Sequence, residues 1–133
     1  MNDQVQTELK KIFSGRFSTS ESTRANYARG EDTYDPVLSK AVVFPETNEE
    51  VSKILRLCNE HKVPVVPFGT GTSLEGNVVG NDKGITICLE RMKKVLSCNV
   101  ADFDCRVQAC VTKEQINDYV RVDGVFVPMD PGA

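Results

Sequence analysis

A glycine-rich segment that directly follows a short apolar run is the feature that most constrains this sequence. Residues 67–77 read PFGTGTSLEGN and follow the run Val63 to Val66. Because glycine lacks a Cβ, Gly69 and Gly71 can adopt positive φ and turn consecutive backbone N–H groups toward one anion. Three neighbouring side chains add hydroxyl donors: Thr70, Thr72 and Ser73. The segment therefore predicts a phosphate-binding loop, with an ordinary turn as the alternative.

Two familiar phosphate-binding motifs do not match this segment. No Lys followed by Ser or Thr comes after the glycines, which excludes the nucleoside-triphosphate P-loop. The glycines lack the spacing of the dinucleotide fingerprint, and residues 74–81 show no helical period. A diphosphate bound here would be held by the loop itself.

The residues before the loop predict a β-α-β unit. Ala41 to Phe44 form a β-branched apolar run, typical of a strand buried on both faces. Thr47 and Glu50 have the spacing of a capping box, and apolar residues then recur at helical spacing over 48–61. With residues 63–68 as a second, parallel strand, the loop leaves the carboxyl end of a strand, where open α/β sheets bind ligands.

The first 40 residues are predicted to be an N-terminal helical segment. Residues 1–14 carry apolar side chains at helical spacing, and Gly15 would end that helix. Ser20 can cap a second short helix that reaches Ala28. The polar stretch 29–36 contains a glycine and a proline, which indicates a loop with a solvated surface.

The residues after the loop predict the start of an antiparallel subdomain. Apolar and polar residues alternate over 85–90, which predicts a half-buried strand. Residues 92–99 and 103–110 predict a hairpin. Thr112 and Gln115 make a second capping box, for a helix whose inner face is marked by Ile116, Tyr119 and Val120. That helix should end before Gly124, followed by a short strand at 125–128 and a turn at 129–133.

Composition excludes several classes of partner. The 133 residues carry a formal net charge of -3 and no basic run, so we expect neither a nucleic-acid nor an anionic-membrane partner. No apolar stretch approaches the roughly 20 residues that a transmembrane helix needs. The N-terminal sequence lacks the features of a secretory signal or a mitochondrial presequence, so we expect a cytoplasmic location, with mitochondria as the alternative.

The cysteines and the single histidine predict neither a metal site nor a catalytic group. None of the five cysteines forms a CxxC pair, and zinc needs ligands at such short spacing. Cys98 and Cys105 could face each other across the hairpin, but an odd number of cysteines in an intracellular chain favours free thiols. His61 falls in the last turn of its helix, which favours a capping role over catalysis.

The segments AVVFPET, VPVVPFGTGTSLEGN and VFVPMDPGA follow one another in an order that resembles a known flavoprotein family. The order is similar to the PCMH-type FAD-binding domain of the vanillyl-alcohol-oxidase-type enzymes, and within it to flavin-linked D-lactate dehydrogenases and the FAD subunit of glycolate oxidase. The resemblance covers residues 25–133. It implies an α/β (α+β) fold over 41–133, with a small parallel β-α-β subdomain followed by the start of an antiparallel-sheet subdomain. The FAD-binding fold in these residues is therefore expected to be incomplete.

The resemblance also implies which residues bind FAD. The implied contacts in the loop are Pro67, Phe68, Gly69, Thr70, Gly71, Thr72, Ser73, Leu74, Gly76 and Asn77, and those near the flavin ring are Pro131 and Gly132. Some relatives attach the flavin covalently through a histidine in this loop. Here Thr72 and Ser73 stand in that place, so we expect non-covalent FAD.

The implied activity is oxidation of a 2-hydroxy acid by hydride transfer to the flavin. This chemistry needs a base for the hydroxyl proton and a cation for the carboxylate, and no residue of the chain is assigned to either role. The complete enzyme is expected to extend beyond Ala133. Homodimers and complexes with partner subunits both occur among similar enzymes, and a homodimer is one possibility for the complete protein. The alternatives are a non-catalytic nucleotide-binding module, a truncated paralogue, and an oxidase of the same family that acts on an alcohol or a sugar.

Overall fold

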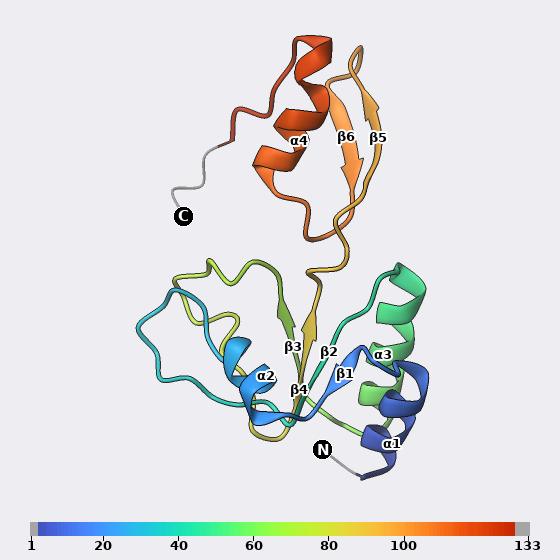
Figure 1. Ribbon diagram of the computed structural model, residues 1–133, viewed down its shortest axis with the longest axis vertical. Coiled ribbons are helices and arrows are strands. Elements are labelled where there is room, and N and C mark those ends of the chain that lie inside the picture. The colour runs from blue at the N-terminus through green and yellow to red at the C-terminus, as the bar shows by residue number, and fades with distance from the viewer. Residues whose placement is uncertain (1–2, 130–133) are drawn as a thin grey trace. The chain divides into compact units, whose positions relative to one another are not determined.

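The chain folds into two compact units of mixed α/β structure, Met1–Arg91 and Met92–Ala133 (Figure 1). The computed structural model describes residues 3–129, and each unit is considered separately. Within the described residues, every helix is too short or too polar to cross a bilayer. The predicted α/β class is confirmed, with a largely parallel sheet in the first unit and an antiparallel hairpin in the second.

The first unit is built on a four-stranded sheet with the order β1-β2-β4-β3. The strands are β1 (Phe17–Ser18), β2 (Ala41–Val43), β3 (Val65–Phe68) and β4 (Ile85–Cys88). β2, β3 and β4 run parallel, and β1 pairs antiparallel with β2. Thr86 of β4 lies opposite Val42 on one side and Val66 on the other. The predicted parallel strands are therefore present, but β4 separates them.

The predicted half-buried strand at 85–90 is wrong in its burial. All four residues of β4 are buried, because the strand lies between two others and the sheet has packed side chains on both faces. Alternation placed Thr86 toward solvent, yet its hydroxyl donates to Ser39 Oγ at 2.8 Å. That oxygen also accepts a hydrogen bond from the Asn81 amide at 3.0 Å. These partners offset the cost of burying the two hydroxyl groups.

Two helices cover one face of this sheet, and a smaller apolar cluster covers the other. α1 (Asp3–Ile12) and α3 (Asn48–Glu60) pack on one face, in the core cluster of Val5, Leu9, Phe13, Ala41, Val43, Ile54, Cys58, Val63, Ile85 and Ile87. α2 (Glu21–Asn26), capped by Ser20 as predicted, leads to Tyr27. Tyr27 packs in a second cluster with Val42, Phe68 and Cys88. Burial of these apolar side chains is the main stabilising contribution.

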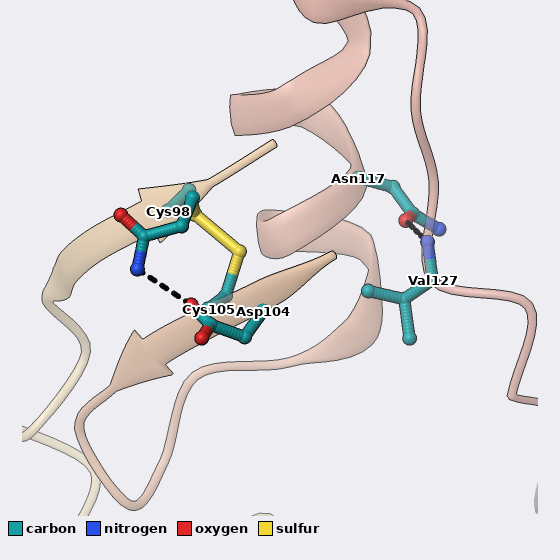
Figure 2. The surroundings of a disulfide bond; sticks show 6 residues. Cys98, Asp104, Cys105, Asn117 and Val127 are labelled. Carbon is teal, nitrogen blue, oxygen red and sulfur yellow. Dashed lines mark hydrogen bonds between the residues drawn. A yellow bond between two sulfur atoms is a disulfide. The ribbon is translucent and has the colours of Figure 1, made fainter. Parts of the chain in front are cut away.

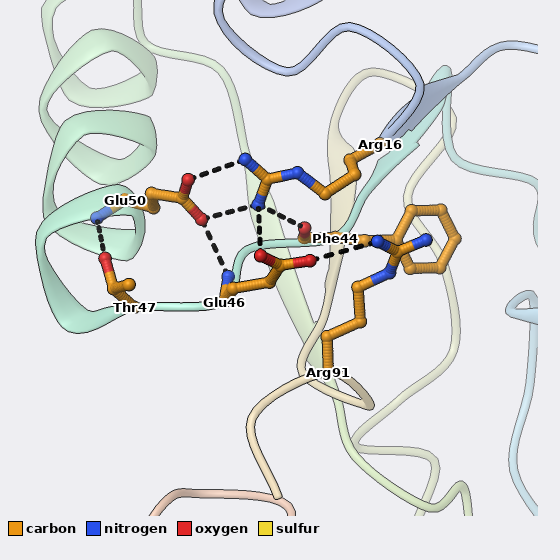
Figure 3. A network of polar contacts seen from close by, with 6 residues as sticks. All are labelled: Arg16, Phe44, Glu46, Thr47, Glu50 and Arg91. Atoms are coloured by element: carbon orange, nitrogen blue, oxygen red, sulfur yellow. Dashed lines mark hydrogen bonds and ion pairs between the residues drawn. The ribbon is translucent and has the colours of Figure 1, made fainter.

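An ion pair anchors the N-terminal segment to α3 (Figure 3). Arg16 donates to both carboxylate oxygens of Glu50 at 2.7 Å and to the carbonyl oxygen of Phe44 at 3.3 Å. The Glu50 carboxylate also accepts from the Glu46 amide at 2.7 Å. The Thr47 hydroxyl accepts from the Glu50 amide, which confirms the predicted helix start. The carboxylate predicted for the capping box is therefore bound to the Glu46 amide and to Arg16, which lies between α1 and β1.

Acid should weaken this anchor. The hydrogen bonds from Arg16 lower the pKa of Glu50 from 4.5 to about 2. Because the folded-state pKa is the lower one, the stabilisation is complete above pH 4.5 and is lost as the pH falls toward 2. Both side chains are partly exposed, so we expect Glu50→Gln to lower the free energy of unfolding at neutral pH by about 1–2 kcal/mol.

Urea unfolding of both proteins at neutral pH and near the folded-state pKa measures this effect. The difference between wild type and Glu50→Gln should shrink at the lower pH. Glu60→Gln, at the exposed end of the same helix, is the matched control. A difference that stays constant across this range would contradict the ion pair as its source.

The second unit contains a hairpin and a helix (Figure 2). Its elements are β5 (Val95–Asn99), β6 (Asp104–Val107), α4 (Lys113–Val120) and the 3-10 helix η1 (Arg121–Asp123). The predicted capping box is confirmed, because the Thr112 hydroxyl accepts from the Gln115 amide and Gln115 accepts from the Thr112 amide. Gly124, with φ +73°, follows η1, so the helical stretch ends where the sequence predicts.

The expectation of free thiols is wrong for Cys98 and Cys105, which form a disulfide across the hairpin (Figure 2). The two residues are directly opposite each other, with Cα atoms 4.2 Å apart. Strand pairing by itself therefore brings their side chains together. Cys58, Cys88 and Cys110 are buried and form no disulfide. The odd number of cysteines carried no information about this local pair.

Two predictions for the end of the second unit are also wrong. Residues 125–128 are not a strand, and the Val127 amide donates to Asn117 Oδ1 of α4 at 2.7 Å (Figure 2). A helix side chain thus accepts the hydrogen bond from a backbone amide that the prediction paired with a neighbouring strand. Tyr119 is 54% exposed, whereas Val120 is buried as predicted. Residues 130–133 of the predicted turn lie outside the described residues.

Candidate functional site

Three parallel strands bring three chain segments to one edge of the first unit's sheet. β2, β3 and β4 run parallel, and the arrows of β3 and β4 point the same way in Figure 1, so residues 44–47, 69–80 and 89–91 all leave the carboxyl edge. The glycine-rich segment is therefore the loop that follows β3. As predicted, it contains bends and turns but no helix. This is the edge at which open α/β sheets bind ligands.

Two glycines in the loop have left-handed backbone conformations. Gly71 has a φ of +80° and Gly76 a φ of +72°. A Cβ on Gly71 would lie 2.8 Å from Cζ of Phe68, and one on Gly76 would lie 2.8 Å from Cδ2 of Tyr34. Gly69 differs, because a Cβ there would have no other atom within 4 Å. Only glycine meets both the conformational and the steric requirement at 71 and 76.

The loop has donors that the described part of the chain does not use. Within residues 3–129, the amides of residues 69–74 donate no hydrogen bond. Thr70 and Thr72 are exposed, with their hydroxyl oxygens 3.4 Å apart. The only charged residue in the segment 67–77 is Glu75, so an anion bound here would depend on amide and hydroxyl dipoles. Hydrogen bonds of this charge-assisted kind contribute about 1.5–3 kcal/mol each.

The predicted contacts divide into exposed residues and residues that support the loop. The exposed ones are Pro67, Thr70, Thr72, Leu74 and Asn77, and the partly buried ones are Gly69, Gly71, Ser73 and Gly76. Phe68 is only 6% exposed, and its ring packs against Gly71. Its side chain therefore supports the loop from the core. Pro131 and Gly132 lie outside the described residues.

No local pattern in the sequence predicts the aromatic cluster at this edge. The Tyr27 ring stands edge-on to those of Phe44 and Phe68, with centroids 5.5 and 5.2 Å away. Its hydroxyl donates to Glu90 Oε2 at 2.9 Å. Burial raises the pKa of Tyr27, and the hydrogen bond to Glu90 adds to the rise, so this phenol stays protonated at neutral pH. The cluster joins the residues that directly follow α2 and β2 to Phe68 of β3 and to Glu90, which comes after β4.

The two arginines near this edge, Arg16 and Arg91, are each already paired with a carboxylate. The guanidinium of Arg91 lies over the Phe44 ring, 5.9 Å from its centroid, and donates to Glu46 Oε1 at 3.0 Å (Figure 3). Arg16 is held by Glu50 in the same network. Within residues 3–129, no cluster of three or more His, Cys, Asp and Glu side chains is arranged to hold a metal ion. The site's distinguishing chemistry is therefore that of the loop donors.

The polar stretch 29–36 packs against the glycine-rich loop. The Glu31 amide donates to the carbonyl oxygen of Gly71 at 3.1 Å. Asp32 is only 9% exposed, so the predicted loop is confirmed but its solvated surface is wrong at this residue. The contact joins segments about 40 residues apart, and polarity and turn residues carry no signal for such a pairing.

Comparisons with known proteins agree with this geometry. The family described as FAD binding domain matches residues 39–133. Over 116 residues the chain is 37% identical to a probable mitochondrial D-lactate dehydrogenase of Danio rerio. The aligned region covers 87% of this chain and 23% of that protein. Over 117 residues the chain is 30% identical to glycolate oxidase subunit GlcD of Bacillus subtilis, which covers 88% and 25%. The resemblance predicted from the sequence motifs is confirmed.

The fold recurs in a solved structure of alkyldihydroxyacetonephosphate synthase, with a TM-score of 0.86 and 19% identity over 98% of this chain and 27% of that one. A likeness at this identity shows the fold alone, which is the PCMH-type FAD-binding fold. The chain spans about a quarter of the length of the proteins it matches. Since the family match includes β2, the glycine-rich loop and the hairpin, the chain belongs to the FAD binding domain family.

Proposed function

We propose that this chain is the FAD-binding portion of a dehydrogenase that oxidises a 2-hydroxy acid, with D-lactate as the first candidate substrate. The observation that carries the proposal is the loop after β3, whose amides at 69–74 have no acceptor among residues 3–129. A diphosphate offers several charged oxygen acceptors to such donors. The 37% identity to a protein named as a D-lactate dehydrogenase supports the substrate class.

In this proposal the residues of the chain bind and orient the cofactor. Gly69 to Ser73 hold the diphosphate, and Gly76 and Asn77 continue the binding segment. Pro67, Phe68 and Leu74 flank it, and Pro131 with Gly132 approach the ring side. When bound, FAD supplies the acceptor for the hydride that leaves the substrate. No residue of the chain is given the role of base or of carboxylate-binding cation.

We further propose that the FAD is bound non-covalently. The chain's single histidine, His61, is the C-cap of α3 and precedes β3. The glycine-rich loop leaves the other end of β3, so His61 lies at the opposite edge of the sheet from the loop. Within the loop, Thr72 and Ser73 offer no nucleophile of the imidazole kind. When the complete protein is denatured and passed through a filter that retains protein, all of the flavin should therefore appear in the filtrate.

Three further expectations, on the domain bounds, the cellular compartment and the assembly, belong to the same proposal. Residues 41–133 contain the FAD-binding region, and residues 1–40 form the N-terminal segment, which carries α1, α2 and the outer strand β1. A cytoplasmic homodimer is the assembly proposed for the complete protein. Cell fractionation tests the compartment against the mitochondrial one named for the zebrafish relative, and sedimentation tests the assembly.

Reconstitution of the complete protein that contains this chain tests the function. We expect one FAD per chain, a flavin absorbance spectrum, and anaerobic bleaching of that spectrum by D-lactate or another 2-hydroxy acid. Bleaching by an alcohol or a sugar alone would favour the alternative oxidase. FAD binding without bleaching by any substrate would favour a non-catalytic module, and failure to bind FAD would refute the proposal.

A further inference from the structure

The segment from Ala28 to Val37 is closed at its base and attached to the end of the glycine-rich loop. The carbonyl oxygen of Ala28, a fully buried residue, accepts from the Val37 amide at 3.3 Å and from the Gly80 amide at 3.0 Å. One oxygen thus joins both ends of the segment to the residue where the loop ends. The residues between them form a closed turn against the loop.

Asp32 organises this turn from inside. Its Oδ2 accepts from the Gly30 amide at 3.1 Å and its Oδ1 from the Tyr34 amide at 3.0 Å. The side chain is buried, whereas those of Glu31 and Asp35 on either side are exposed. A buried carboxylate is tolerated when its oxygens are hydrogen-bonded, and here both oxygens bind backbone amides. Asp32 therefore sets the backbone conformation at 30–34.

The tip of the turn binds one carbonyl group of the loop and lies close to a second. The Glu31 amide donates to the Gly71 oxygen at 3.1 Å. A Cβ on Gly30 would lie 2.7 Å from the Ser73 oxygen and 2.8 Å from the Gly71 oxygen, so the lack of a side chain there permits the approach. On the same turn, the Tyr34 ring fills the space beside Gly76.

The direction of these carbonyls determines where the next amides point. In a trans peptide the C=O and N–H bonds point in opposite directions. Because the oxygens of Gly71 and Ser73 face the turn, the N–H groups of Thr72 and Leu74 point away from it. Neither amide has an acceptor among residues 3–129. The turn thus holds two donors in a direction in which they are free to bind a ligand.

We propose that Asp32 is a positioning residue for the diphosphate site. It holds the turn whose Glu31 amide and side-chain-free Gly30 orient the peptide groups after Gly71 and Ser73, so that the amides of Thr72 and Leu74 face the diphosphate. The inference rests on the proposed function, since it concerns the same site. It assigns a role to a carboxylate that contacts no ligand itself and would repel one at close range.

FAD titration of the complete protein with three variants tests this role. Asp32→Ala removes both acceptors, and Asp32→Asn keeps one and places an NH₂ group where the other was. Asp35→Ala is the matched control, because Asp35 lies on the same turn and its side chain is exposed. We expect the Kd for FAD to rise about tenfold or more in Asp32→Ala, less in Asp32→Asn, and not in Asp35→Ala.

A second measurement separates positioning from general stability. Hydrogen exchange of the Glu31 amide in the FAD-free protein should accelerate in Asp32→Ala, because the turn no longer holds it against Gly71. Ile54→Val, on the buried face of α3, should lower the Tm without changing the Kd for FAD.

Four outcomes are distinct. Weaker FAD binding with faster Glu31 exchange in Asp32→Ala alone supports the inference. Wild-type FAD binding by Asp32→Ala overturns it and leaves the proposed function standing. If Ile54→Val binds FAD as weakly as Asp32→Ala does at the same Tm, the inference is also overturned, because the loss of binding then follows from lower stability. Failure of the wild type to bind FAD refutes the proposed function and the inference with it.

Discussion

Replacement of Gly71 by Val is expected to abolish FAD retention by the complete protein, with an increase in Kd of about 100-fold or more. The residue has a φ of +80°, which a β-branched side chain disfavours strongly. Its Cβ would also lie 2.8 Å from Cζ of the buried Phe68 ring. The backbone must move to relieve both conflicts, and the amides of Thr72 and Ser73 move with it. Loss of two charge-assisted hydrogen bonds accounts for this magnitude.

Gly15→Val is the matched control for this variant. Gly15 also has a positive φ, +77°, and a Cβ there would have no other atom within 4 Å. It lies between α1 and β1, and β1 and β3 are the two outer strands of the sheet. The control thus carries similar backbone strain away from the loop. Flavin per chain after gel filtration, Kd by flavin fluorescence and Tm are measured for each protein, and full retention of flavin by Gly71→Val would contradict the assignment of the loop.

Gly80→Ala is expected to destabilise the first unit by about 3 kcal/mol or more. A Cβ at this position would overlap the carbonyl oxygen of Val37 and lie 3.0 Å from Ser39 Oγ. The obstacle is backbone, so no rotamer change relieves it. Any shift of Gly80 also strains its hydrogen bond to Ala28, which closes the turn beneath the loop. The cost therefore falls at the upper end of that for overpacking a core.

Thermal unfolding followed by circular dichroism measures this effect. For a unit of this size the loss corresponds to a decrease in Tm of about 10 °C or more. Gly69→Ala is the control, since its added Cβ has no atom within 4 Å and its φ is not positive. A Gly80→Ala protein that unfolds at the control's temperature would show that Val37 and Gly80 are not in close contact.

Local patterns in the sequence were sufficient for the elements of the fold and for the position of the loop. The cap at Thr47, the apolar run of β2 and the capping box at Thr112 each depend on residues within a few positions of one another. The glycine-rich loop was predictable for the same reason, because a strand and its following turn are adjacent in the chain. Backbone geometry and hydrogen-bond spacing act over these distances without knowledge of the fold.

The tertiary structure alone decided which of these elements became partners. β4 lies between β2 and β3, and this made Thr86 a buried residue although its alternation is that of a half-exposed strand. Alternation reports burial only where one face of a sheet meets solvent, and a central strand has none. The contact of Asp32's turn with the loop likewise depends on backbone atoms that meet only after folding. The sequence by itself determined the chemistry of the loop, whereas packing between distant segments determined the direction in which its donors point.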